Sequence, residues 1–376
     1  MKRFISLCCI FSFVLSMPVY AENSITVNAK SAVLMEQSTK QILYESNPDE
    51  HLPIASVTKI MTLLLIMEAL DEGKITMEDM VPVSERAMSM GGSTMFLEAG
   101  EQLSVYEMIK GIAVASANDG CVAMAEYICG SEEAFINAMN ERAAELGMEN
   151  THFTNTNGLD ADDHYSSARD VALMSAELLK HEKIFEFTTI WTDKMHDGKF
   201  DLANTNKLIR FYPGANGLKT GSTSQALCCL SATALRDDLQ LIAVVLGAPT
   251  SNDRFTAART LLDYGFANYA IDKPIKQDDE VGRVEVKKGV YEELAVSAKE
   301  SFSLLLSKSE KGSCENEVII PEYVTAPVVK GDVIGKMVFT KNGENVGEVE
   351  LVAANDVEKK KLSDYLLDIF SLLFSL

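Results

Sequence analysis

The sequence predicts an α+β protein in which an antiparallel sheet with packed helices carries a helical lobe, followed by a small all-β domain and a C-terminal amphipathic helix. Three observations support this fold class. Predicted strands come first, then several helical stretches, then more strands and a helix, which is the order expected for a sheet with a large helical insertion. Short strands separated by glycines fill residues 281–352, and an apolar stretch after three lysines ends the chain.

Residues 22–273 are predicted to form the sheet and its helical lobe. A hairpin covers residues 24–45, with strands over 25–27, 32–35 and 41–44. Apolar periodicity then predicts helices over 56–70, 105–117, 121–129 and 132–146. Strands over 227–234 and 239–246 flank a turn at 236–238, and a helix over 253–267 ends this part. A chain of 376 residues has room for a second domain as well.

The composition shifts near Asp272-Lys273-Pro274, so that residues 274–357 are predicted to be the separate β-domain, which has no catalytic motif. Residues 358–376 are predicted to be an amphipathic helix that begins with Lys359-Lys360-Lys361. This helix is too short to span a bilayer. It either packs on the β-domain or lies on a membrane surface through residues 359–376, with its lysines facing anionic headgroups. A very apolar terminal helix after a basic run favours the membrane.

The N-terminus has the features of a signal peptide. Lys2 and Arg3 precede an apolar run, and Val19-Tyr20-Ala21 resembles a cleavage site, so residues 1–21 are expected to be removed after Ala21. The alternative, an uncleaved membrane segment, is disfavoured because the run is short. Cleavage changes the formal net charge from −21 to −23, because the leader contains two cations and no anion. We therefore expect an exported protein at the outer face of the cytoplasmic membrane or in the cell wall, with no nucleic-acid partner.

Five cysteines remain after cleavage, and an odd number leaves at least one thiol unpaired within the chain. Four of them lie in apolar helical or strand-like stretches, and we interpret these four mainly as small buried hydrophobic residues: Cys121, Cys129, Cys228 and Cys229. No disulfide framework is expected.

The stretch Ser56-Val57-Thr58-Lys59 begins an apolar helical run. Residues three apart lie on one face of a helix, so the Lys59 amine can reach the Ser56 hydroxyl. A neutral lysine there can remove the serine proton, provided that burial or a neighbouring cation keeps its pKa low. Alone the pattern is weak, because about one such match is expected by chance in a chain of this length.

Two later motifs make the first one more specific. Ser116-Ala117-Asn118 follows a predicted helix, and Lys219-Thr220-Gly221 precedes a predicted strand. Taken alone, the first is more often a helix cap or turn. The second is not the end of a phosphate-binding loop, because Leu218 stands where such a loop requires glycine.

The order and spacing of the three motifs resemble those of the penicilloyl-serine transferases. Further stretches resemble the D-alanyl-D-alanine carboxypeptidases, which are low-molecular-mass penicillin-binding proteins, and the resemblance covers essentially the whole mature chain. These stretches are Phe96-Leu97-Glu98-Ala99-Gly100, Asn157-Gly158-Leu159-Asp160, Ser166 with Ala168-Arg169-Asp170, and Leu261-Leu262-Asp263-Tyr264-Gly265-Phe266. The expected fold is therefore that of the serine β-lactamases and DD-peptidases.

The resemblance implies a catalytic role for Ser56 as the nucleophile that attacks a D-Ala-D-Ala bond of a peptidoglycan stem pentapeptide. It implies that Lys59 is the general base, with its pKa held down by flanking cations, and that Ser116 relays a proton to the leaving amine. β-Lactams are expected to acylate Ser56, and no cofactor is required.

The resemblance also implies the substrate-binding residues. Asn118 would bind a substrate carbonyl and orient Lys59. The backbone N–H groups of Ser56 and Ser222 would form the oxyanion hole. Lys219 and Thr220 would hold the terminal carboxylate with help from Arg254. The implied substrate-binding residues are then Asn118, Lys219, Thr220, Gly221, Ser222 and Arg254.

Two positions depart from the family pattern. Some members have histidine directly after the K-T-G motif, where this chain has Ser222, so the deacylation rate can differ. Some also have an arginine that aligns near Thr205, which leaves Arg254 with less help.

Two alternatives follow from the same motifs. A class A β-lactamase would carry aspartate at Ala117 and a glutamate in the loop after Asn157, and this chain has neither. A non-catalytic wall-binding or penicillin-sensing protein could share the fold, but all the catalytic positions are intact.

No metal site is predicted. The five histidines show no H-E-x-x-H or paired spacing: His51, His152, His164, His181 and His196. Asp160, Asp162 and Asp163 lack the glycine and the distal glutamate of a calcium loop, so they are interpreted as residues that cap and order their loop.

Overall fold

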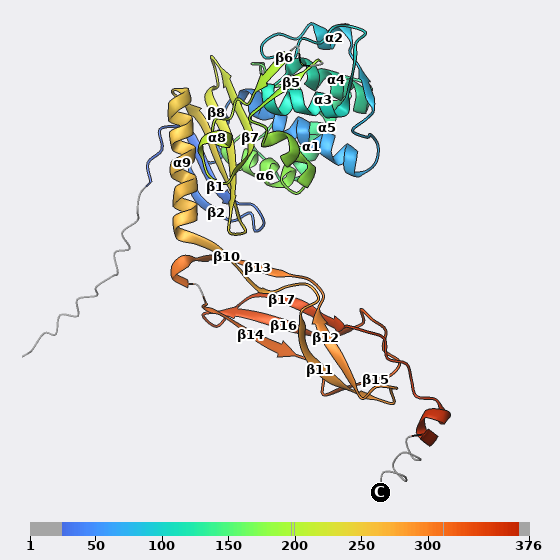
Figure 1. Cartoon of the computed structure of the whole chain (residues 1–376). Helices are drawn as coiled ribbons and strands as arrows, with labels where there is room; N and C mark the ends of the chain where they lie inside the picture. The colour runs from blue at the N-terminus through green and yellow to red at the C-terminus, as the bar shows by residue number, and fades with distance from the viewer. Residues whose placement is uncertain (1–24, 197, 199, 311, 368–376) are drawn as a thin grey trace, which may run out of the picture.

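The computed structural model describes residues 25–196, 198, 200–310 and 312–367 (Figure 1). The predicted signal peptide and the end of the predicted amphipathic helix lie outside these residues.

A five-stranded antiparallel sheet forms the centre of the N-terminal part, in the order β2-β1-β9-β8-β7. Alternate residues of its strands enter two different cores, as the twofold repeat of a strand requires. Ile242 and Val244 of β9 face the core on the helical side, whereas Leu241 and Ala243 face the other core. The strands are β1 (Ser31–Glu36), β2 (Ile42–Ser46), β7 (Ala215–Thr223), β8 (Leu227–Arg236) and β9 (Leu239–Ala248).

Helices cover both faces of this sheet (Figure 1). α9 (Ser251–Asn268) and the short α8 (Leu208–Phe211) pack on one face. The other face carries α1 (Lys59–Asp71), which is apolar on nearly all sides and is therefore the central helix of the lobe. Around it lie α2 (Glu85–Met88), α3 (Val105–Lys110), α4 (Asn118–Cys129), α5 (Glu132–Glu145), α6 (Ala168–Leu178) and α7 (Phe185–Thr188).

Short elements complete the helical lobe. Two small hairpins are formed by β3 (Met80–Pro82) with β4 (Gln102–Ser104) and by β5 (Thr192–Met195) with β6 (Phe200–Ala203). The 3-10 turns are η1 (Ala55–Thr58) and η3 (Glu182–Ile184), and η2 (Gly111–Ala115) is a π-helical turn.

The structure confirms the predicted fold class and corrects several predicted elements. Residues 25–27 are not a strand. In place of the helix predicted over 105–117, α3 ends at Lys110, the π-helical turn η2 follows, and Ser116 after it is in the left-handed conformation. α6 was not predicted from the sequence. The K-T-G motif was expected at a strand start, but Lys219 lies in the middle of β7.

The C-terminal part is an all-β domain with its own core, in which Phe339 and Leu351 are fully buried. β10 (Tyr269–Ile275) pairs with β13 (Phe302–Ser307), and a six-stranded sheet has the order β14-β16-β17-β12-β11-β15. The bounds are β11 (Glu280–Lys287), β12 (Glu293–Ala298), η4 (Lys308–Glu310), β14 (Cys314–Ile319), β15 (Tyr323–Thr325), β16 (Val333–Lys341) and β17 (Glu344–Ala353). The predicted boundary at 273/274 falls within β10, and the division into domains stays a prediction.

After the β-domain, residues 362–367 are helical. Three leucines of this helix are at least half exposed: Leu362, Leu366 and Leu367. Within the described part of the chain, no helix is both long enough and apolar enough to span a bilayer.

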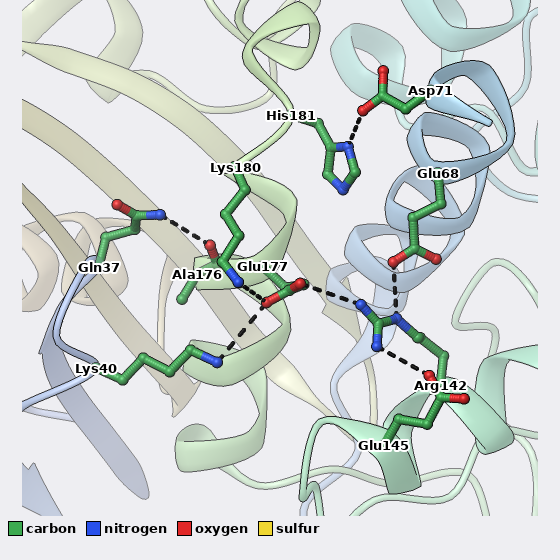
Figure 2. Close-up of polar contacts among 10 residues, drawn as sticks. All are labelled: Gln37, Lys40, Glu68, Asp71, Arg142, Glu145, Ala176, Glu177, Lys180 and His181. Atoms are coloured by element: carbon green, nitrogen blue, oxygen red, sulfur yellow. Dashed lines mark hydrogen bonds and ion pairs between the residues drawn. The ribbon is translucent and has the colours of Figure 1, made fainter. Parts of the chain in front are cut away.

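An ion-pair network fixes the C-terminal half of α1 (Figure 2). Arg142 of α5 donates to Glu68 of α1 at 2.8 Å and to Glu177 of α6 at 3.2 Å. His181, just after α6, lies 2.6 Å from Asp71 at the end of α1. The network therefore joins α5 and α6 to α1, the helix whose first residue is Lys59.

Candidate active site

Ser56 lies in the 3-10 turn η1, directly before α1, and the backbone of this turn is enclosed by two glycines. Gly158 has φ +85°, and a Cβ there would lie 1.9 Å from the Ala55 carbonyl oxygen. A Cβ at Gly221 of β7 would lie 2.6 Å from the Ile54 oxygen and 2.9 Å from the Ser56 nitrogen. Only glycine permits two backbone segments to approach the serine turn this closely.

The Lys59 side chain is fully buried, and its amine has three oxygen neighbours. Nζ lies 2.9 Å from Ser56 Oγ, 2.6 Å from Asn118 Oδ1 and 2.6 Å from the Asn157 carbonyl oxygen. A neutral amine has two N–H donors and one lone pair. If the donors are directed to the two carbonyl-type oxygens of Asn118 and Asn157, the lone pair is left for the hydroxyl of Ser56.

Burial lowers the pKa of Lys59 to about 8, and the neighbouring Cys121 and Asp119 side chains oppose the shift. The direction agrees with the requirement drawn from the sequence, which named burial or a neighbouring cation as the cause. The resemblance implied flanking cations, whereas desolvation of the ammonium is what lowers the pKa.

Ser116 and Asn118 occupy the break between η2 and α4. Ser116 has φ +65° and is the C-cap residue of η2, and Asn118 is the first residue of α4. The Asn118 amide orientation is fixed because its Nδ2 donates to the Gly91 carbonyl at 2.7 Å while its Oδ1 accepts from Lys59. Among the described residues the Ser116 hydroxyl has no hydrogen-bond partner, which leaves it available to a substrate atom.

Asp119 is a residue of the site that sequence reasoning missed. Its buried carboxylate accepts backbone N–H groups from Met95 at 3.1 Å, Leu97 at 3.2 Å and Gly120 at 2.9 Å. It thereby holds the loop that supplies the Gly91 carbonyl to Asn118. An acidic residue in the first turn of a helix was the available signal.

The third motif lies along β7, opposite the serine turn. Lys219 is buried, and its Nζ donates to the Thr220 carbonyl at 3.2 Å. Burial, and then the positive charge of Lys59, hold the pKa of Lys219 well below its usual range. Thr220 Oγ1 donates to Thr205 Oγ1 at 2.7 Å, so Thr205 is in direct contact with the motif.

Ser222 and Arg254 lie at the end of β7 and beneath it. Ser222 is exposed. The Arg254 guanidinium is buried and donates to the carbonyls of Gly221 at 2.9 Å and Cys229 at 3.3 Å, and burial lowers its pKa. These contacts hold β7 and β8 in place, and a direct contact of Arg254 with substrate stays a prediction.

The loop after α5 supplies the remaining contacts. Besides the Asn157 carbonyl, it carries His164, which is buried behind the serine turn and 2.8 Å from Thr58 Oγ1. Thr223 Oγ1 donates to Asp160 at 2.7 Å, which agrees with the interpretation that this aspartate orders its loop. Neither Asn157 nor His164 was predicted to take part in the site.

The described residues contain no cluster of three or more His, Cys, Asp or Glu side chains suited to a metal ion. The five cysteines of the described chain are free thiols: Cys121, Cys129, Cys228, Cys229 and Cys314. Cys121 and Cys229 are buried as predicted, whereas Cys129 and Cys228 are half-buried.

A serine beside a buried lysine amine, with a second serine, an amide and a Lys-Thr-Gly strand around it, defines an active-site-serine acyltransferase of the penicilloyl-serine transferase class. Comparison with known proteins is more specific. Residues 18–250 match the family of D-alanyl-D-alanine carboxypeptidases, and residues 269–359 match the C-terminal domain of penicillin-binding protein 5.

The chain is 48% identical over 335 residues to the D-alanyl-D-alanine carboxypeptidase DacF of Bacillus subtilis, covering 88% of this chain and 86% of that protein. It is similar to the crystal structure of penicillin-binding protein 5 from Haemophilus influenzae, with a TM-score of 0.73 and 32% identity over 89% of this chain and 99% of that one. Penicillin-binding protein D2 of Listeria monocytogenes in its ampicillin-bound form is also similar, with a TM-score of 0.59 and 30% identity over 65% of this chain and 99% of that one. The chain belongs to the D-alanyl-D-alanine carboxypeptidase family of serine peptidases, which confirms the family predicted from the motifs.

Replacing Gly158 with alanine tests whether the loop after α5 sets the geometry of the serine turn. Gly147 is a matched control, because it has φ +74° but open space around its Cβ position. We expect Gly147→Ala to lower the free energy of unfolding by about 1 kcal/mol through backbone strain alone. Gly158→Ala should lower it by about 3 kcal/mol and slow acylation by penicillin at least about tenfold, because the clash displaces Ser56. Equal effects of the two variants, measured by thermal unfolding and penicillin labelling, would contradict this account.

Proposed function

We propose that this D-Ala-D-Ala carboxypeptidase removes the terminal D-alanine of peptidoglycan stem pentapeptides through an acyl-enzyme on Ser56. The observation that carries the proposal is the buried Lys59 amine, 2.9 Å from the Ser56 hydroxyl and with its pKa lowered to about 8. A neutral amine in that position is a general base for the hydroxyl.

In the acylation step, Ser56 Oγ attacks the carbonyl carbon of the bond between the two D-alanines, and its proton moves to Lys59 Nζ. The negative charge that develops on the carbonyl oxygen is held by the backbone N–H groups of Ser56 and Ser222. Ser116 passes its hydroxyl proton to the leaving amine and takes the proton held by Lys59, so the C–N bond breaks, D-alanine departs and Lys59 is neutral again. Water then attacks the ester, Lys59 takes a proton from the water and returns it to Ser56 Oγ as the ester bond breaks, and Ser56 is restored.

Substrate recognition is assigned to the two other motifs. Lys219 and Thr220 bind the terminal carboxylate, and Asn118 Nδ2 and the backbone of β7 orient the peptide. The Lys219 amine and the Arg254 guanidinium lie in an interior that water does not screen, where an anionic end group would stabilise the protonated form of Lys219. β-Lactams carry a carboxylate next to a reactive carbonyl and acylate Ser56 in place of substrate; the ampicillin-bound relative supports this assignment.

The location of the protein is also a proposal. Export through the signal peptide would place the enzyme where peptidoglycan lies, and residues 359–376 would hold it against the membrane surface. The exposed leucines of helix 362–367, after three lysines, support an interfacial helix. The β-domain, residues 274–357, would then lie between the membrane and the catalytic part.

Ser56→Ala is the direct test of the nucleophile. Labelled penicillin should acylate the peptide that contains Ser56 in the native enzyme, and the variant should lose both labelling and release of D-alanine from a pentapeptide by at least about 10³-fold. The exposed Ser363 supplies a control serine whose replacement should change neither measurement. Release of D-alanine by Ser56→Ala at the native rate would refute the mechanism.

The pH dependence tests the general base. Because Lys59 must be neutral to accept a proton and its pKa is about 8, kcat/KM should rise about tenfold per pH unit below pH 8 and level off above it. The second-order rate constant for acylation by penicillin should show the same acidic limb. A rate constant that does not change between pH 6 and 9 would exclude Lys59 as the base.

Deletion of residues 362–376 tests the membrane proposal. The truncated protein should move from the membrane fraction to the soluble fraction and keep its activity on a soluble pentapeptide, because the active site lies in another domain. Leu366→Asp should weaken partition into anionic lipid vesicles, whereas Ser363→Asp is the matched change outside the apolar residues. Unchanged partition of the deletion variant would exclude this segment as the membrane contact.

A further inference from the structure

We propose that Thr58 and His164 are positioning residues that orient the Ser56 N–H group of the oxyanion hole. The proposal rests on the function proposed above, in which this N–H stabilises the oxyanion, and adds the device that aims it.

The starting point is the peptide between Ala55 and Ser56. This peptide is trans, because the cis bonds of the described chain lie elsewhere. In a trans peptide the C=O and N–H groups point in opposite directions within one plane. Any group that fixes the Ala55 carbonyl therefore fixes the direction of the Ser56 N–H. Thr58 does so, since its Oγ1 donates to the Ala55 carbonyl at 2.9 Å.

His164 sets the direction of the Thr58 hydroxyl. Its Nδ1 accepts the backbone N–H of Thr154 at 3.0 Å, so the ring proton of the neutral imidazole is on Nε2. Nε2 lies 2.8 Å from Thr58 Oγ1 and donates to it, which leaves the single hydroxyl proton of Thr58 for Ala55. Burial lowers the pKa of His164 to about 4, so this arrangement holds at neutral pH.

The chain of hydrogen bonds is buried and has one direction, from Thr154 N–H through His164 and Thr58 to the Ala55 carbonyl. Thr58 is fully buried and His164 is 6% exposed. Each bond polarises the next in such a chain, and a polarised carbonyl makes the N–H of the same peptide a stronger donor. The chain therefore both aims and strengthens the Ser56 donor.

The conformation of Ala55 shows why such support is needed. Its φ is +47°, in the left-handed region that a residue with a Cβ adopts only at a cost. Gly158 and Gly221 restrict this peptide through contact with its backbone, but neither supplies a hydrogen bond that selects the peptide orientation. The Thr58 hydroxyl makes that selection.

Thr58→Val is the test, because it keeps the shape of the side chain and removes the hydroxyl. We expect the rate constant for acylation by penicillin to fall about tenfold to 100-fold, with kcat for D-alanine release falling and KM changing by less than about threefold. In the acyl-enzyme, the infrared stretching band of the ester carbonyl should move to higher wavenumber, because its hydrogen bond in the oxyanion hole weakens. Thr58→Ser keeps the hydroxyl and should restore both values.

Thr233→Val is a matched control on strand β8. Thr233 is also fully buried, and its hydroxyl donates to the Asn216 side-chain oxygen at 2.7 Å, away from the Ala55–Ser56 peptide. It should lower stability to a similar degree as Thr58→Val and leave the acylation rate and the carbonyl band unchanged. A rate loss in both variants would show that Thr58 acts only through packing, and would overturn the proposal.

His164 variants keep the proposal testable if Thr58→Val does not fold. His164→Gln retains an N–H donor for Thr58 and should acylate within about threefold of the native rate, whereas His164→Leu should resemble Thr58→Val. In a double-variant cycle the effects of His164→Leu and Thr58→Val should not add, because both break the same chain. A native carbonyl band in His164→Leu overturns the proposal while Ser56→Ala still confirms the nucleophile, so the two failures are distinct.

Discussion

The active site depends on one constraint, which is that the Lys59 amine lies in the protein interior with no carboxylate bonded to it among the described residues. An ammonium group in such a place loses its hydration, and the neutral form is favoured because it costs less to bury. Three oxygens from three separate segments satisfy the amine. The serine turn, the start of α4 and the loop after α5 must therefore all be in place for the role of base that we propose for Lys59.

The rest of the fold brings those segments together. α1 is buried on almost every side, and the ion pairs of Arg142 tie its far end to α5 and α6. β7 is an edge strand of the central sheet, yet its Gly221 lies against the serine turn. Arg254 donates hydrogen bonds to carbonyl oxygens of β7 and β8, so the same guanidinium that places charge beneath β7 also fixes the position of this strand. The contacts that pack the strand therefore also position the groups of the site.

Sequence reasoning found the site residues that act through a side chain and whose spacing along the chain predicts that they meet in space. Ser56 and Lys59 were predicted to meet because three residues separate them on a helix, and they do. Asn157 could not be found in this way, since it contributes a backbone carbonyl, which leaves no mark on residue type.

Long-range packing explains the other differences between the prediction and the structure. Ser116 adopts the left-handed conformation after a π-helical turn, and helical periodicity does not report it. Burial and a neighbouring cation were both named as causes of a low Lys59 pKa, because burial of one side chain cannot be read from a motif. The order of strands and helices, by contrast, follows from local patterns, and the fold class was predicted correctly.

The chain is strongly acidic although its site contains basic side chains. These two facts are compatible because the surface charges and the buried groups of the site act over different distances. The formal net charge of −21 is spread over a surface that salt screens within about 10 Å. Lys59 and Lys219 are buried, and they lie close enough together that the charge of Lys59 lowers the pKa of Lys219. Protonation of one amine therefore opposes protonation of the other. In the proposed mechanism, a substrate carboxylate beside Lys219 would stabilise a proton there, so the site can bind an anionic end group although burial of its two lysines disfavours their charged forms. The acidic surface and the buried basic groups therefore act on substrate at different distances.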